Sequence, residues 1–178
     1  MEKQKVLVWD IAVRAFHWLL ALSFAGAFLT AESERTRDVH VVLGYAVLGL
    51  VAFRLVWGLV GTRYARFWSF AYGPGSVLSY VKSLFSESPQ HHLGHNPAGS
   101  WAIYALLGLS VLAGASGYAA YNDIGGHWME EVHEAMANSL LAVVVVHVAG
   151  VLVSSLIHRE NLVLSMLTGY KVHARPRR

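Results

Sequence analysis

The stretch VHEAMANSLLAVVVVHV, residues 132–148, places two histidines fourteen positions apart and is otherwise largely apolar. An α-helix rises about 1.5 Å per residue and completes a turn every 3.6 residues or so, so His133 and His147 share one face, about 21 Å apart along the axis. Ionisable side chains within an apolar span are costly and usually functional. The stretch therefore predicts a membrane helix that presents two imidazoles to partners at different depths.

The composition supports a membrane location. The chain has 178 residues, of which 55% are hydrophobic and 14% charged, and its mean hydropathy is +0.43. Such a chain is too apolar for a single water-soluble domain. It has no cysteine, which excludes disulfides, thiolate metal sites, iron–sulfur clusters and haem attachment through C-x-x-C-H. The ten histidines are then the main candidates for metal ligands.

Four segments are long and apolar enough to cross a hydrocarbon core of about 30 Å, which needs roughly 20 helical residues. They are residues 11–31, 39–60, 100–120 and 135–157. Asp10 directly precedes the first segment and Arg14 and His17 lie within it, which argues against a cleaved signal peptide. We therefore predict an all-α integral membrane protein, a four-transmembrane-helix bundle that forms one domain over residues 1–170.

The charges predict the orientation of this bundle. With four spans, both termini and the long segment 61–98 lie on one side of the membrane. That side holds most of the basic residues: Lys3, Lys5, Arg14, Arg54, Arg63, Arg66, Lys82, Arg159, Lys171, Arg175, Arg177 and Arg178. The other side holds seven carboxylates: Glu32, Glu34, Asp38, Asp123, Glu130, Glu131 and Glu134. The positive-inside rule therefore places both termini in the cytoplasm, and the pI of 9.3 needs no nucleic acid partner.

Two segments on the basic side have the pattern of interfacial helices. Residues 75–86 have apolar side chains at helical spacing and a polar opposite face, which predicts a helix on the membrane surface. The segment ENLVLSMLTGYK, residues 160–171, is a second candidate. The basic tail, residues 171–178, is expected to be disordered.

The depths of four histidines match in pairs. His17 is six residues into the first span, and His147 lies ten residues from the same surface in the fourth, a depth that tilt of the helix would reduce. His40 opens the second span on the outer side, at the level of His133. Two imidazoles that project from different helices are what a b-type haem requires. We therefore predict two low-spin bis-histidine haems, one bound by His17 and His147 and one by His40 and His133.

Small residues near these ligands would admit the flat macrocycle. They are Gly26, Gly44 and Gly150, although close packing of membrane helices is an equally common reason for glycine. His127 is an alternative to His133 as outer ligand. For the haem propionates, Arg14 and Arg54 are candidates on the cytoplasmic side, and Arg35 and Arg37 on the outer side; Arg14 could equally be a membrane anchor.

Other metal centres fit the sequence less well. The spans contain no glutamate, which a di-iron carboxylate bundle needs. A zinc site needs three or four ligands in one small sphere, whereas these histidines are divided between two depths. HHLGH at residues 91–95 could bind a metal but has no fourth ligand nearby. We expect Asn96 and Pro97 to begin the third span as its N-cap and first helical residue.

Several motifs resemble one family. FHWLL at 16–20, DVHVVLGY at 38–45, GHNPAGSW at 94–101 and the opening stretch are similar to the bacterial cytochrome b561 family, which is related to the b-type cytochrome subunits of nickel-iron hydrogenases and formate dehydrogenases. The resemblance covers nearly the whole chain and implies the same two histidine pairs, with no ligand from the third span. Because family members often act as subunits or dimers, it is also compatible with a homodimer.

Two functions follow from these expectations. Six-coordinate haem iron favours electron transfer over chemistry on a bound ligand, and the resemblance implies exchange between membrane ubiquinone or menaquinone and a periplasmic redox partner across the bacterial inner membrane. The alternative is an enzyme, because HEAMAN at 133–138 is also similar to superoxide oxidases, which oxidise superoxide and reduce ubiquinone. The outer carboxylates would repel that anion and suit a basic partner such as a c-type cytochrome or a subunit of a redox enzyme.

Overall fold

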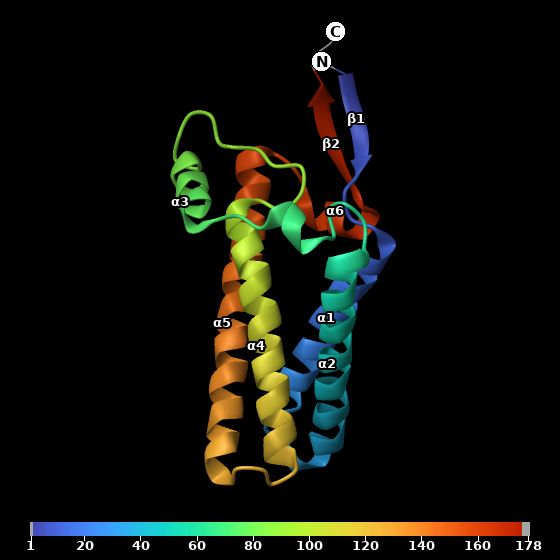
Figure 1. Ribbon diagram of the computed structural model, residues 1–178, viewed down its shortest axis with the longest axis vertical. Helices are drawn as coiled ribbons and strands as arrows, with labels where there is room; N and C mark the ends of the chain where they lie inside the picture. The colour runs from blue at the N-terminus through green and yellow to red at the C-terminus, as the bar shows by residue number, and fades with distance from the viewer. Residues whose placement is uncertain (1, 176–178) are drawn as a thin grey trace. The chain divides into compact units, whose positions relative to one another are not determined.

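The computed structural model describes residues 2–175 and is mostly helical (Figure 1). Its elements, in chain order, are β1 (Glu2–Leu7), α1 (Ile11–Leu29), α2 (Arg37–Val60), α3 (Pro74–Ser83), α4 (Pro97–Tyr121), α5 (His127–His158), α6 (Leu162–Thr168) and β2 (Tyr170–Arg175). Two short 3-10 helices, Glu34–Thr36 and Phe67–Phe70, precede α2 and α3.

Helices α1, α2, α4 and α5 are each long and apolar enough to cross a membrane. Large apolar side chains along them are exposed, among them Leu29 at 83% and Leu156 at 78%. Such exposure would be unfavourable in water but is normal against lipid chains. Each predicted span corresponds to one of these helices, and their length and composition support a multi-pass membrane protein.

The fourth helix extends beyond the predicted span. The span was predicted over residues 135–157, with His133 just outside it at the outer surface, and α5 runs from His127 to His158. Gly125 and Gly126, with φ of +91° and +68°, form the turn before it, and Glu130 lies in its first turn, where a negative charge suits the helix dipole. The first two turns of α5 are polar, so a search for apolar residues does not find them. His133 lies inside the helix.

The chain divides into two compact units. Unit 1 comprises residues 1–14, 57–102 and 147–178, and unit 2 comprises residues 15–56 and 103–146. Each unit contains segments of several of the long helices.

Unit 2 is built from segments of all four long helices. Between α1 and α2, a Cβ at Gly26 would lie 2.8 Å from Leu43 Cδ1, and between α2 and α4, a Cβ at Gly114 would lie 2.3 Å from Leu48 Cδ2. Glycine at these positions therefore allows close helix approach. For Gly26 this is the packing role that we considered as the alternative to admitting a macrocycle.

Unit 1 joins the two ends of the chain. Strands β1 and β2 pair antiparallel, from Glu2 opposite Arg175 to Leu7 opposite Tyr170. The strand β2 takes in residues 171–175, which we expected to be part of a disordered tail; residues 176–178 lie outside the described residues. The carbonyl of Gly169 accepts hydrogen bonds from the backbone N–H groups of Val8 and Trp9, which fixes the chain where β1 ends.

The two predicted interfacial segments are helical. The prediction over 75–86 corresponds to α3, and the segment 160–171 contains α6. The side chain of Asn161 caps α6 by accepting from Leu164 N at 2.8 Å, and Gly169, with φ of +90°, ends it. Asn161 and Gly169 thus define the two ends of α6.

Candidate functional site

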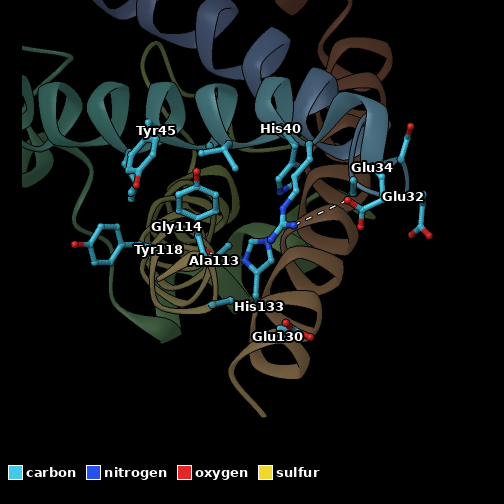
Figure 2. A pocket seen from close by; sticks show the side chains of 18 residues that line it. Glu32, Glu34, His40, Tyr45, Ala113, Gly114, Tyr118, Glu130 and His133 are labelled. Carbon is cyan, nitrogen blue, oxygen red and sulfur yellow. Dashed lines mark hydrogen bonds and ion pairs between the residues drawn. The ribbon is translucent and has the colours of Figure 1, made fainter. Parts of the chain in front are cut away.

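A cavity of about 320 Å³ opens in unit 2 between α2, α4 and α5. His40 of α2 and His133 of α5 line it and project into it from opposite sides (Figure 2). Gly44, Gly117 and Tyr118 form part of the walls. The cavity therefore contains two imidazoles that come from different helices.

The two imidazole rings are spaced as two ligands of one metal ion would be. Their centroids are 6.0 Å apart and their planes are inclined by 82°. Two imidazoles that bind one ion from opposite sides, each through a bond of about 2 Å, have centroids roughly 6 Å apart. The spacing of His40 and His133 fits a single ion between them.

The hydrogen bonds of these rings leave one nitrogen of each for a ligand. His40 Nδ1 donates to the carbonyl oxygen of Ala27 in α1, and His133 Nδ1 donates to that of Ala113 in α4, each at 2.8 Å. Because a carbonyl oxygen can only accept, each Nδ1 carries the proton and each Nε2 keeps its lone pair. Such outer partners orient metal-binding histidines and fix their tautomer.

Helix α4 makes room for the His133 ring without supplying a ligand. A Cβ at Gly117 would lie 2.9 Å from His133 Cε1, so any larger residue would displace the ring. On α2, a Cβ at Gly44 would meet no atom within 4 Å, so this side of the cavity is open. The sequence did not single out Gly117; the run of small residues AGASG at 113–117 was the available signal.

The mouth of the cavity is mainly acidic. Glu32, Glu34 and Glu130 line it, and so does Arg37, whose Nη1 lies 4.0 Å from Glu34 Oε2. Both members of this pair are largely exposed, at 62% and 92%, so their attraction is weak. Of the cations on this side, Arg37 is the one that reaches the cavity lining among the described residues.

His127, the alternative outer ligand, lies elsewhere. Its Nδ1 is 3.0 Å from Glu130 Oε2, its Nε2 is 3.9 Å from Glu131 Oε1, and its side chain is 82% exposed. These carboxylates are available to both ring nitrogens. Of the two histidines considered for this position, His133 is the one that faces His40.

The other predicted ligands belong to different units. His17 lies on α1 in unit 2, where its ring contacts that of Trp18 at a centroid distance of 5.0 Å. His147 lies on α5 in unit 1. A Cβ at Gly150, one turn further along, would meet no atom within 4 Å. The pairing of His17 with His147 stays a prediction.

The arginines predicted near the inner haem have protein partners. Arg14 donates from Nη1 to the carbonyl oxygen of Leu167, in the last turn of α6, where a cation also suits the helix dipole. Arg54 is 3% exposed and interacts electrostatically with Tyr104. Arg14 thus has a clear role in unit 1, and a role of either arginine toward a propionate stays a prediction.

The HHLGH segment does not converge on a metal. His91 Nε2 lies 2.9 Å from Glu160 Oε1, while His95 packs against Trp9 and Phe70, with centroid distances of 4.6 and 4.3 Å. Among residues 2–175 there is no group of three or more His, Asp or Glu side chains that could hold a metal ion. The predicted start of the third span is confirmed, because α4 begins at Pro97 and Asn96 Oδ1 accepts from Gly99 N at 2.7 Å.

Comparisons with known proteins agree with this site. A family model described as prokaryotic cytochrome b561 matches residues 8–169. The probable Ni/Fe-hydrogenase B-type cytochrome subunit of Rhizobium leguminosarum bv. viciae is 22% identical over 97% of the chain and 91% of that relative. The probable Ni/Fe-hydrogenase 1 B-type cytochrome subunit of Escherichia coli K12 is 23% identical (93% and 90%), and the corresponding subunit of Cupriavidus necator is 24% identical (92% and 86%).

No solved structure matches the chain. The residues around the cavity nevertheless fit the haem that a cytochrome family implies: two imidazoles with free Nε2 atoms face each other, and glycines replace side chains beside them. The match to the family model includes all of the residues that form the four long helices. The chain therefore belongs to the prokaryotic cytochrome b561 family.

Proposed function

We propose that the chain is a di-haem b-type cytochrome that carries electrons across the bacterial inner membrane, between the quinone pool and a redox partner on the opposite side. His40 and His133 bind one haem, and His17 and His147 bind the other. The observation that carries the proposal is the His40–His133 pair, with a centroid distance of 6.0 Å and both Nδ1 atoms bound to backbone carbonyls. For the second pair, the matched depths in the sequence provide the support.

The residues of the chain prepare the first site for electron transfer. His40 and His133 would hold a haem through their Nε2 atoms, and a haem held in this way would supply one-electron chemistry. The carbonyls of Ala27 and Ala113 hold the two rings, so little rearrangement accompanies a change in charge. Gly44 leaves space for the macrocycle and Gly117 leaves space for the His133 ring, and Arg37 at the mouth pairs with a propionate.

The orientation proposed from the sequence places both termini in the cytoplasm and the mouth of this cavity in the periplasm. Three glutamates line that mouth, and charges of one sign steer partners of the opposite sign. The partner is then a basic protein, such as a c-type cytochrome, or a subunit of a redox enzyme. The names of the hydrogenase-linked relatives support the second kind of partner.

The number of haems tests the proposal directly. Protein purified in detergent should be red, show the reduced-minus-oxidised bands of low-spin b haem, and contain two haems per chain. Extraction of haem and quantification against protein measures this ratio. One haem per chain would contradict the paired sites, and a colourless folded protein would contradict the assignment as a whole.

Kinetics distinguish electron transfer from superoxide oxidation. The reduced protein should react rapidly with a basic c-type cytochrome, and increasing ionic strength should slow the reaction because it screens the attraction. Reduction of the oxidised protein by superoxide should be slow, because the carboxylates around the mouth repel the anion. A superoxide rate close to diffusion would favour the enzyme instead.

A further inference from the structure

The end of α5 in unit 1 carries a group of ionisable side chains that the electron-transfer site does not use. They come from the segment before α4, from the end of α5 and from β2: His91, His92, His158, Glu160 and Lys171. Glu160 is central. One of its oxygens lies 2.9 Å from His91 Nε2, and the other lies 4.0 Å from Lys171 Nζ.

Three of these side chains form a line from water toward the interior of unit 1. The side chain of His91 is 39% exposed, that of Glu160 is 22% exposed, and that of Lys171 is 8% exposed. Lys171 Nζ lies 5.9 Å from the centroid of the Trp9 ring, which belongs to the core of this unit. Burying the ammonium group of Lys171 is unfavourable. An ion pair that served only to stabilise the surface would therefore not require a buried lysine.

The surroundings lower the pKa of Lys171 and of His92. Burial lowers the pKa of Lys171, and the nearby carboxylate of Glu160 only partly opposes this. Burial, together with the neighbouring His91, also lowers the pKa of His92. His158 contacts the His91 ring at a centroid distance of 5.3 Å and faces the same carboxylate. Lys171 therefore releases a proton more readily than a lysine in water.

The backbone at the end of α5 positions Glu160. Arg159 has φ of +51°, the left-handed conformation with which helices commonly end. The N–H of Arg159 donates to the carbonyl of Leu156, and the N–H of Glu160 donates to that of Ser155 at 3.1 Å. These two hydrogen bonds fix the backbone of the residue that connects His91 to Lys171.

We propose that His91, Glu160 and Lys171 form a proton-transfer route from water into unit 1, which serves the reaction of a membrane quinone. The inference rests on the proposed function, because a quinone that takes two electrons through the haems also needs two protons to become a quinol. For each proton, Lys171 releases one inward, Glu160 passes one to Lys171, and His91 replaces it from water. The three residues then return to their initial states, and quinol oxidation runs the same route in reverse.

Single-turnover oxidation of the reduced protein tests the route. Haem oxidation is followed at its visible absorption band after mixing with decylubiquinone or menadione, and separately with ferricyanide, which takes one electron and no proton. Glu160→Gln keeps the size of the side chain but cannot carry the proton. It should slow oxidation by quinone at least about tenfold and leave oxidation by ferricyanide unchanged. Added imidazole, a small proton carrier, should restore part of the quinone rate.

Glu87→Gln is the matched control, since Glu87 is an exposed carboxylate in the same chain segment as His91. It should react with quinone like the wild type. If Glu160→Gln also reacts like the wild type, the proton route is overturned and the proposed function stands. If the wild-type protein does not react with either quinone, the proposed exchange with quinone is itself wrong, and the route is overturned with it.

Two further measurements apply if Glu160→Gln does not fold. His91→Gln should slow the quinone reaction in the same way, because it removes the entry point. Wild-type protein in heavy water should react more slowly with quinone but not with ferricyanide. Equal quinone rates in light and heavy water would overturn the proposal.

Discussion

The polar residues of the two units are used in opposite ways. In unit 2, His40 and His133 each bind a backbone carbonyl through one nitrogen and present the other to an open cavity. In unit 1, polar side chains bind each other or the backbone across long stretches of sequence, as Asp10 does with Thr62 and Arg14 with Leu167. In unit 2, one nitrogen of each histidine is left for a ligand. In unit 1, these polar groups form hydrogen bonds within the fold. Substitutions at the His40–His133 cavity should therefore affect cofactor content, and those at the Asp10 contacts should affect stability.

The largest effect should come from removing a ligand in unit 2. His133→Ala deletes one of the two imidazoles of the cavity, so the protein should retain one haem per chain instead of two. Haem extraction and the reduced-minus-oxidised spectrum measure the loss. His127→Ala is the control, because that exposed ring lies beside Glu130 and Glu131. Normal haem content in His133→Ala would show that another residue binds the iron.

A smaller loss should follow from crowding the same ring. Gly117→Ala would place a Cβ 2.9 Å from His133 Cε1, so the ring must move and haem affinity should fall. Gly108→Ala is the same substitution on the same helix, with no atom within 4 Å of the new Cβ. Both changes favour the helix by up to about 1 kcal/mol. Haem titration of the two variants separates the crowding from the gain in helix propensity, and equal affinities would argue against a tight ring site.

In unit 1, Asp10→Ala should lower stability without removing the haem of the His40–His133 site. Asp10 Oδ1 accepts from Val13 N at 2.8 Å and caps α1, while Oδ2 accepts from Thr62 Oγ1 at 2.6 Å and from Trp57 Nε1 at 3.2 Å. Loss of the cap and of these bonds should reduce the free energy of unfolding by about 2 kcal/mol. Thermal unfolding in detergent measures the change. If Asp10→Ala also lost that haem, haem binding in unit 2 would depend on the stability of unit 1.

The same residue gives a pH dependence. Partial burial opposes ionisation of Asp10, but the hydrogen bonds from Thr62, Val13 and Trp57 outweigh it and lower the pKa. A carboxyl with a lower pKa in the folded state stabilises above its unfolded pKa of about 3.9, and this contribution is lost as the pH falls through the folded value. The stability difference between wild type and Asp10→Ala should thus be constant near neutral pH and shrink below about pH 4. A difference that grows on acidification would contradict this assignment.

The smallest effect should come from the cap of α6. Asn161→Ala removes the side-chain acceptor for Leu164 N and should cost about 1 kcal/mol. Asn161→Asp retains an acceptor and should unfold like the wild type. The haem of the His40–His133 site should be retained in both variants, because Asn161 does not line that cavity.

The sequence predicted the helices and the histidines of unit 2 because both depend on periodicity. Apolar runs revealed the four spans, and matched depth brought His40 and His133 together. The role of α4 was not predicted, since a glycine such as Gly117 looks the same whether it accommodates a helix or an imidazole ring. Its function becomes visible only when the ring of His133 is in place.

Unit 1 was harder to predict because its contacts are distant in sequence. The charged strand EKQKVL pairs with residues more than 160 positions away, and no local pattern identifies that partner. The contacts of Glu160 with His91 and Lys171 likewise join three separate segments. By contrast, Asn96 was informative, because a helix cap depends on neighbouring residues.

The pairing of β1 with β2 also sets an order of events during biosynthesis. A ribosome makes residues 2–7 before residues 170–175, so β1 must wait, without its partner, until all four long helices have been made. The ribbon can therefore pair only late in synthesis. A nascent chain that stalls before Tyr170 leaves the hydrogen-bonding edge of β1 open.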